Sequence, residues 1–210
     1  MSKTSLAAIV RYCDRLLRTA KVQDYERAAN GLQVENRGNV TRVAAAVDAS
    51  LATARLAAAA RADLLLVHHG LFWGPTHPWT GKRYDLIRFL FEHNLAVYSS
   101  HLPLDAHPRL GNNAQLCAAL GLKKLRPFFF NHGQFIGFQT QTKTSRAELA
   151  RRLQRATGSK PLLIPIPFSS LTTRATVEAA TAFQRQRQAT LQVFFPDHKW
   201  VVYPSFSRIL

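Results

Sequence analysis

The sequence predicts an α/β fold of two lobes, with mostly parallel sheets covered by helices and an atypical C-terminal segment. Three observations support this prediction. Strand-like and helix-like patterns alternate across the first 120 residues, as in repeated strand–helix units. The stretch 63–67 is apolar on both faces, as expected of a strand buried between helices. Lys123 to Pro127 then interrupts the pattern, which predicts a first α/β lobe over 1–126 and a smaller α/β lobe over 127–210.

In the first lobe, apolar residues recur at helical or strand spacing between turn formers. Thr4 or Ser5 can cap the first helix, and Gly121 can end the last one. The predicted helices cover 6–17, 50–62, 84–93 and 113–120. The predicted strands cover 32–34, 40–47, 63–67 and 95–98.

The second lobe has a weaker pattern. Ser145 and Glu148 have capping-box spacing and predict a helix that ends before Gly158. Strand-like segments cover 128–130, 135–140, 162–166, 191–195 and 200–203. Pro165 and Pro167 limit the third of these to a sheet edge. Residues 176–189 are compatible with a helix.

The net charge of +16 is unevenly distributed. Residues 1–106 carry 13 Lys/Arg against 9 Asp/Glu, whereas residues 107–210 carry 15 against 3. Such a field attracts polyanions such as nucleic acids and phosphorylated metabolites. The alternative is an Arg-rich background on solvated helix faces, because no helix-turn-helix, ribonucleoprotein or zinc-finger signature accompanies the charge. Nucleic acid is therefore a secondary candidate partner.

Composition indicates a cytoplasmic protein with reduced thiols. No apolar run approaches the roughly 20 residues of a membrane-spanning helix, and the first residues do not resemble a signal peptide. We therefore expect no membrane partner. Cys13 and Cys117 are the only cysteines, and each sits in a helix-like apolar pattern. This favours two buried thiols over a disulfide or a redox pair.

The strand-like run that begins at Leu64 ends in His68, His69 and Gly70. Adjacent side chains of a strand point to opposite faces. At a strand end where Gly70 lets the backbone turn, both imidazoles can still reach one crevice from different sides, which suits two metals better than one. In open α/β sheets, ligands bind in such crevices outside the carboxyl ends of the strands.

A second strand, 95–98, is followed by His101 and Asp105. Asp105 would supply an oxygen ligand, and His101 would add a nitrogen ligand or hold Asp105 in place. Nitrogen and oxygen ligands favour Zn, Mn, Fe, Co or Ni over Cu(I) or iron–sulfur clusters. Two ions about 3.5–4 Å apart would activate a bridging water and polarise a phosphoryl or carbonyl oxygen. The alternative is that the two adjacent histidines occur by chance in the core or in a loop and bind no metal.

Five segments, in order, resemble one known family: Asn30 to Glu35, Ala46 to Ser50, Leu65 to Trp73, Tyr98 to Ala106 and Gly111 to Asn113. Together they make residues 1–160 similar to the hexameric dinuclear-metal-centre family, known as NIF-three-like proteins or GTP cyclohydrolase 1 type 2 homologues. The resemblance implies a ring-shaped homohexamer of two-lobed α/β subunits. It also implies two metals per subunit, bound by His68, His69 and Asp105, with His101 at the same site.

The C-terminal part departs from the family pattern. The family completes its site with a His followed four residues later by a Glu, and no histidine after Asp105 has a glutamate at that spacing. A frameshift or premature end would explain the change in composition after residue 163, and resequencing for a His-x-x-x-Glu frame would test it. Divergence with Asp197 or His198 as substitute ligands is the alternative. With the closing ligands missing, we expect weak or single-metal occupancy and low hydrolytic activity.

The leading interpretation is a divalent-metal-dependent hydrolase in which a metal-activated water is the nucleophile. No catalytic side chain is assigned. Ser99 and Ser100 lack a Gly-x-Ser-x-Gly elbow, and no phosphate-binding glycine motif is present. A small phosphorylated or heterocyclic substrate would suit this chemistry. The alternative is a non-catalytic, metal-binding regulatory ring whose basic surface binds nucleic acid or an acidic partner.

Several other residues near the motifs have two interpretations. Trp73 and Trp79 could form a stacking wall for a ring or could pack between lobes or subunits. Asn30 and Glu35 could support either the site or the fold. Asp48 ends a strand and could hold a metal ligand in place.

Overall fold

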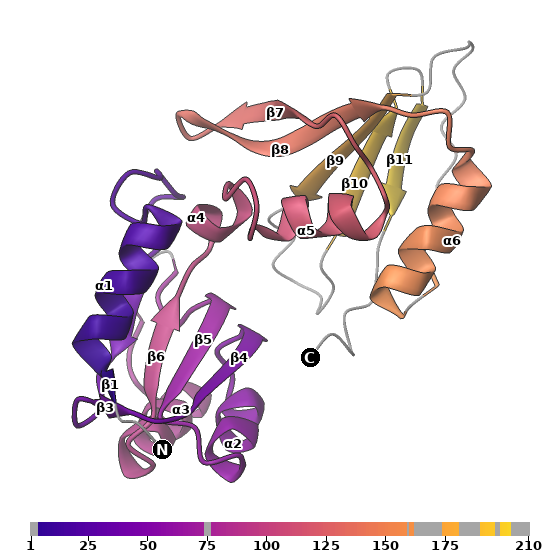
Figure 1. The fold of residues 1–210 in the computed structure, drawn as a ribbon. Helices are drawn as coiled ribbons and strands as arrows, with labels where there is room; N and C mark the ends of the chain where they lie inside the picture. Colours follow the sequence, from indigo (N-terminus) through magenta and orange to yellow (C-terminus); the bar gives the residue numbers. More distant parts are fainter. Residues whose placement is uncertain are drawn as a thin grey trace. The chain divides into compact units, whose positions relative to one another are not determined.

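The computed structural model describes residues 4–73, 77–158 and 160–161, together with three strands in the C-terminal part. The chain divides into two compact units after Leu104. The elements of each unit are shown in Figure 1. The sequence placed the lobe boundary at residue 126, whereas in the structure α5 (Asn112–Ala119) already packs with the second unit.

The first unit is built on a four-stranded sheet in the order β2-β6-β5-β4. β4 (Val43–Asp48), β5 (Leu64–His69) and β6 (Ala96–Ser99) are parallel, and β2 (Gly31–Val34) pairs antiparallel with β6. A separate two-stranded ladder joins β1 (Thr4–Ser5) to β3 (Asn39–Val40). The parallel pairing predicted from the strand–helix alternation is therefore present in this unit.

Helices cover both faces of this sheet because the central strand is apolar on both sides. Leu65 and Val67 of β5 pack with α2 (Leu51–Ala59) and α3 (Lys82–Glu92) on one face. Leu64 and Leu66 pack with α1 (Leu6–Leu17) on the other. This is the period-two alternation of a strand buried between two helical layers.

The helix starts follow the predicted caps. The Ser5 hydroxyl accepts a hydrogen bond from the backbone N–H of Ala8, and Ser50 forms a capping box with Thr53 at the start of α2. In the second unit, the Ser145 hydroxyl accepts from the N–H of Glu148 at the start of α6 (Arg146–Thr157). Gly121 and Gly158 follow α5 and end α6 with φ values of +68°, the left-handed conformation that glycine adopts without steric cost.

The second unit contains a five-stranded sheet in the order β11-β10-β9-β8-β7, antiparallel throughout. Its strands are β7 (Arg126–Asn131), β8 (Gln134–Gln141), β9 (Arg174–Ala180), β10 (Thr190–Phe195) and β11 (His198–Val202). His132 and Gly133 join β7 to β8 with positive φ at both residues, the conformation of a two-residue hairpin turn. Such a tight turn forces the two strands to run antiparallel.

Two C-terminal expectations are revised or lie outside the described residues. Residues 176–180 form part of strand β9 instead of a helix, because they pair with β8 on one side and β10 on the other. Residues 181–189 and the strand-like segment 162–166 lie outside the described part of the chain. The predicted strands at 191–195 and 200–202 correspond to β10 and β11.

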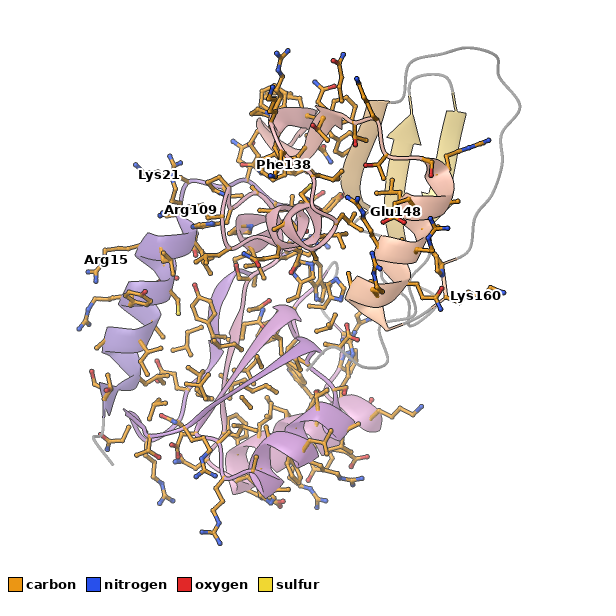
Figure 2. All side chains as sticks on the ribbon, turned by 45° about the vertical axis from the view of Figure 1, so that its right-hand side comes forward. Arg15, Lys21, Arg109, Phe138, Glu148 and Lys160 are labelled. Carbon is orange, nitrogen blue, oxygen red and sulfur yellow. The ribbon has the colours of Figure 1, made fainter. Side chains whose placement is uncertain are left out.

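A helical layer accompanies the second sheet. Cys117 and Leu120 from the α5 region pack with Leu149 and Leu153 of α6, and Phe138 of β8 joins this cluster. Figure 2 shows Phe138 on its strand and Glu148 on α6. The Glu148 carboxylate pairs with Arg151 and Arg152 at 2.9 Å each, and the hydrogen bonds from these guanidinium groups lower its pKa. The α/β fold class predicted from the sequence is confirmed.

Within the described ranges, no helix has the length and apolar character needed to cross a membrane.

Candidate metal centre

The candidate site lies at the carboxyl ends of β5 and β6, within the first unit. His68 and His69 are the last residues of β5, and His101 lies two residues beyond the end of β6. The parallel register pairs Val67 with Ser99, and the N–H of Ser100 donates to the carbonyl of Val67 at 2.9 Å. The strand pairing therefore brings two histidine-bearing segments together that are 32 residues apart in the sequence.

The three imidazoles form one cluster. The ring centroid of His68 lies 4.6 Å from that of His69 and 4.9 Å from that of His101. One ligand nitrogen from each ring lies within 4.8 Å of the others. The two adjacent histidines do not diverge, because they occupy the strand end, where the backbone leaves the regular pleat at Gly70. This is the convergence that the sequence predicted for His68 and His69.

Each of the three rings is oriented through its Nδ1 atom by an oxygen acceptor. Nδ1 of His68 lies 3.0 Å from the carbonyl oxygen of Ser100. Nδ1 of His69 lies 2.7 Å from Oδ1 of Asp48, and Nδ1 of His101 lies 2.9 Å from Oδ1 of Asp24. A carbonyl or ionised carboxylate can only accept, so Nδ1 carries the proton, and in the neutral imidazole the lone pair is then on Nε2. Metal-binding histidines in proteins are held in this way.

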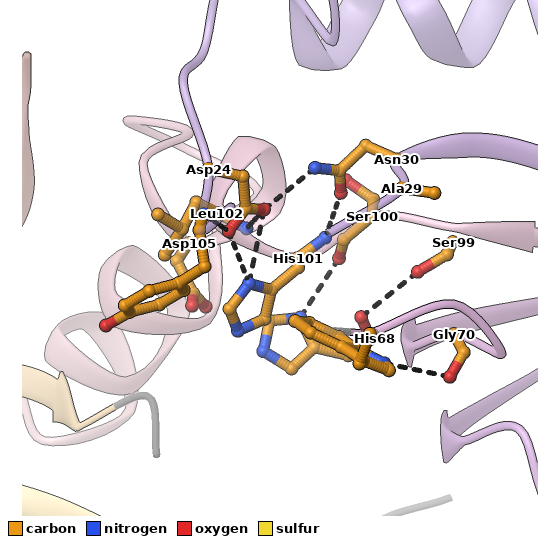
Figure 3. A network of polar contacts seen from close by, with 12 residues as sticks. Asp24, Ala29, Asn30, His68, Gly70, Ser99, Ser100, His101, Leu102 and Asp105 are labelled. Atoms are coloured by element: carbon orange, nitrogen blue, oxygen red, sulfur yellow. Dashed lines mark hydrogen bonds and ion pairs between the residues drawn. The ribbon is translucent and has the colours of Figure 1, made fainter. Parts of the chain in front are cut away.

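Asp24 is the most heavily bonded residue of the site, as Figure 3 shows. Besides His101, it accepts hydrogen bonds from the Asn30 amide at 2.7 Å and from the backbone N–H groups of Tyr25 and Leu102 at 2.7 and 3.0 Å. Burial by itself would raise the pKa of Asp24, but the hydrogen bonds from His101, Asn30 and Tyr25 outweigh it and lower this pKa to about 2. The Asp24 and His101 side chains are each only 5% exposed.

Asp48 holds His69 in a more open environment. Its side chain is 59% exposed and that of His69 is 41% exposed. The hydrogen bond from His69 and the nearby imidazoles of His69 and His68 hold the pKa of Asp48 below its usual range, against the opposing effect of burial. The two carboxylate–imidazole pairs therefore differ mainly in solvent access.

An aromatic wall borders the cluster. The Trp73 ring lies edge-on to His101 with centroids 4.6 Å apart and to His69 at 5.9 Å. The Trp73 indole N–H donates to the carbonyl of Gly70 at 2.9 Å, which fixes the ring against the strand end. Trp79 is separate from this wall: it packs edge-on against Phe72 and is half-exposed.

Asp105 is 1% exposed and accepts a hydrogen bond from the Asn112 amide at 2.9 Å. It is the last residue of the single-turn helix α4 (Leu102–Asp105) and the first residue of the second unit. The His68, His69 and His101 cluster does not include it. Its role as an oxygen ligand stays a prediction.

Asp24, which was not predicted as a site residue, lies in an irregular segment between α1 and β2. Its position six residues before the Asn30-Gly31 motif was the available signal. Asn30, for which the sequence left two roles open, supports the site: its Oδ1 accepts from the backbone N–H of His101 at 2.7 Å. Asp48 has the supporting position that the sequence offered as one of its roles. Glu35 is exposed.

Fold and site together define a class: a two-unit α/β protein with a candidate polyhistidine metal centre at the carboxyl edge of a parallel sheet. Residues 4–174 match the family described as Duf34/NIF3 (NGG1p interacting factor 3). The chain belongs to this family, which confirms the resemblance seen in the sequence.

Curated relatives of the chain are named GTP cyclohydrolase 1 type 2 homolog. The Deinococcus radiodurans protein is 41% identical over 152 residues, covering 71% of this chain and 57% of its own length. The Halobacterium salinarum protein is 45% identical over 160 residues, covering 73% of this chain and 62% of its own length. The chain therefore spans about three fifths of the length of these relatives.

Solved structures support the same family fold. TTHA1606 from Thermus thermophilus is 35% identical, with a TM-score of 0.69 over 82% of this chain and 69% of its own. Reduced HcgD from Methanocaldococcus jannaschii has a TM-score of 0.75 over 86% of this chain and 71% of its own. At 21% identity, the likeness to HcgD supports the fold alone.

Proposed function

We propose that the chain is a divalent-metal-dependent hydrolase whose metal ligands are His68, His69, His101 and Asp105. One observation carries the proposal: three imidazoles converge, and each has its Nδ1 tied to an oxygen acceptor. This arrangement directs the lone pairs at Nε2 as metal ligation requires. A cluster of three histidines serving only the core would not need all three rings in the same tautomer.

The donor set fits a borderline divalent cation. Three imidazole nitrogens, with a carboxylate expected from Asp105, suit Zn, Mn, Fe, Co or Ni. The two thiols belong to α1 and α5 and stand outside the cluster. A bound ion of this kind supplies an activated water and a Lewis acid for hydrolysis of a phosphoryl or carbonyl compound. The aromatic wall at Trp73 limits solvent access to His101, which strengthens electrostatic interactions there.

The protein residues have defined tasks in this proposal. Asp24, Asp48 and the Ser100 carbonyl fix the ring orientations, and Asn30 ties the segment at His101 to β2. No side chain is assigned as a nucleophile. The name of the relatives, GTP cyclohydrolase 1 type 2 homolog, is compatible with hydrolysis of a small phosphorylated or heterocyclic substrate.

The sequence after Asp105 contains no His followed four residues later by a Glu. The ligands proposed from the residues at hand are therefore the three imidazoles and the Asp105 carboxylate. The family resemblance leads us to propose a homohexamer, and the composition a cytoplasmic location.

A second function is favoured by one observation, the net charge of +16. A metal-binding regulatory protein that binds nucleic acid or an acidic partner would use this field. Arg15 and Lys21 extend away from the body of the first unit (Figure 2). Binding of this kind would weaken steeply with salt.

A single comparison separates the two functions. Hydrolysis of 4-nitrophenyl phosphate and bis(4-nitrophenyl) phosphate is measured with Mn²⁺ or Zn²⁺ for the wild type, His68→Ala and His93→Ala. His93 is the control, because it is an exposed histidine stacked on Phe89 outside the cluster. The hydrolase function predicts metal-dependent turnover by the wild type. His68→Ala should abolish this turnover, and His93→Ala should retain it. Absence of turnover, with salt-sensitive binding of single-stranded or duplex nucleic acid, would support the second function instead.

A further inference from the structure

A hollow of about 170 Å³ lies in the first unit, where β4 and β5 end and α3 begins. Its lining includes Ala49 and Gly70, the residues that follow the ends of the two strands. The rest of the lining comes from Leu71, from Trp79 in the following loop, and from α3. The carboxyl ends of parallel strands are the usual place for ligands in open α/β sheets.

This hollow directly adjoins the candidate metal centre. Gly70 follows His69, and Ala49 follows Asp48, the residue that orients the His69 ring. The backbone N–H of Ala49 donates to the carbonyl of His69 at 2.8 Å, so this part of the lining is hydrogen-bonded to the strand end that carries the histidines. The hollow therefore borders the backbone next to His69, while the three imidazoles of the cluster are not part of its lining.

The lining has the chemistry of a ring-binding site with one anion contact. Leu71, Leu86 and Ile87 provide aliphatic surface, and Trp79 provides an indole that is 48% exposed. Arg83 is the single charged residue of the lining, and within the described ranges no acidic group forms an ion pair with it. A guanidinium beside apolar walls binds phosphate or carboxylate groups, which it can contact with two N–H donors.

The volume limits the size of the group that fits. A cavity of about 150 Å³ lined by aliphatic and aromatic side chains accommodates one benzene molecule. The hollow is of similar size and open on one side, so one aromatic ring fits while its substituent projects toward the rim.

We propose that this hollow is a substrate subsite that holds the aromatic or heteroaromatic ring of a compact anionic ligand, with Arg83 pairing the phosphoryl or carboxyl group. Trp79 contacts the ring, and the Leu71, Leu86 and Ile87 side chains exclude water from it. The proposal deepens the proposed hydrolase function, since the reacting group would be presented to the neighbouring histidines. Ring binding itself requires no metal.

The test uses phenylphosphonate, which has a ring and an anionic group but no hydrolysable P–O–C linkage. Binding to the full chain is measured by isothermal titration calorimetry in EDTA, so that the metal centre does not contribute. Inorganic phosphate supplies the anion without the ring, and benzyl alcohol supplies the ring without the anion. We expect saturable binding of phenylphosphonate that is at least about tenfold tighter than that of either fragment.

Two variants and one control assign the contacts. Arg83→Gln should weaken phenylphosphonate binding about tenfold and leave benzyl alcohol binding unchanged, whereas Trp79→Ala should weaken both. Arg88→Gln is the matched control: Arg88 lies on the same helix, outside the lining, where it faces Glu92 and the Tyr84 ring. Equal losses in the Arg83 and Arg88 variants, or equal affinity for phenylphosphonate and inorganic phosphate, would overturn the proposal.

The binding of phenylphosphonate and the hydrolase activity can be tested separately. Loss of phenylphosphonate binding with metal-dependent turnover intact would reject the subsite and keep the hydrolase. Specific binding through Arg83 and Trp79 without any turnover would keep the subsite and reject the hydrolase.

Discussion

The substitution Asp24→Asn should weaken metal binding even though it is nearly isosteric. Asp24 Oδ1 accepts hydrogen bonds from the Tyr25 N–H and from His101 Nδ1, while Oδ2 accepts from the Asn30 amide and the Leu102 N–H. An asparagine has only one acceptor oxygen. Whichever way its amide is turned, the NH₂ group faces two N–H donors.

The magnitude follows from these contacts. A buried donor left without an acceptor costs about 1–3 kcal/mol, so two such donors cost about 2–6 kcal/mol of folding free energy if the amide stays in place. If the substituted side chain instead moves away from these donors, the His101 ring loses the acceptor that orients it. Loss of a partner that orients a metal-binding histidine weakens metal binding about 10- to 100-fold, or about 1.4–2.7 kcal/mol.

The assay is a Zn²⁺ titration against a chromophoric chelator, combined with urea unfolding followed by circular dichroism. Asp85→Asn is the matched control, because Asp85 is an exposed carboxylate in the first turn of α3. Asp48→Asn should have a smaller effect than Asp24→Asn, since Asp48 is largely exposed. Wild-type zinc affinity in folded Asp24→Asn protein would contradict this prediction.

Three further predictions concern the scaffold. Tyr98→Phe should lower the free energy of urea unfolding by about 1.5–3 kcal/mol, because the buried Tyr98 hydroxyl donates to Asp14 at 2.8 Å; Tyr12→Phe, at an exposed tyrosine, should leave it unchanged. Ser145→Ala should cost about 1 kcal/mol in the same assay by removing the N-cap of α6, and an unchanged midpoint would contradict this. Burial raises the pKa of Cys117 to about 12, so its thiol should resist iodoacetamide at pH 9 until urea is added, as peptide mass spectrometry would detect.

The raised pKa of Cys117 also makes the free energy of unfolding depend on pH. The folded state keeps the thiol proton up to about pH 12, whereas an unfolded thiol loses it near pH 8.5. The unfolded state therefore binds fewer protons between these values, and the free energy of unfolding falls as the pH rises through this window. Below pH 8 the contribution of Cys117 is constant.

Short-range sequence patterns were sufficient to predict most helices and strands of the first unit. Apolar periodicity and caps such as Ser5 and Ser50 depend on neighbouring residues, and they predicted α1 and α2 well. The aliphatic run before His68 predicted a strand buried on both faces, and the strand ends then predicted where side chains of the site would meet. Such inferences need only the geometry of a parallel sheet.

Long-range contacts explain what the sequence did not reveal. Asp24 reaches His101 across 77 residues through an irregular segment, whose path depends on tertiary packing and leaves no periodic pattern. The segment 176–180 has helix-compatible residues, yet its ladder with β8 and β10 makes it a strand. The orientation of the imidazoles through Nδ1 likewise depends on acceptors from other segments, including Asp48 and the Ser100 carbonyl.

In the proposed function, His68, His69 and His101 bind a divalent cation together. The most direct measurement is a Zn²⁺ titration of metal-free protein, followed by elemental analysis after gel filtration, for the wild type, His101→Ala and His93→Ala. We expect the wild type and His93→Ala to retain at least one ion, and the zinc affinity of His101→Ala to be lower by a factor of about ten or more. Equal zinc affinity in all three proteins, or no retained ion in any, would contradict it.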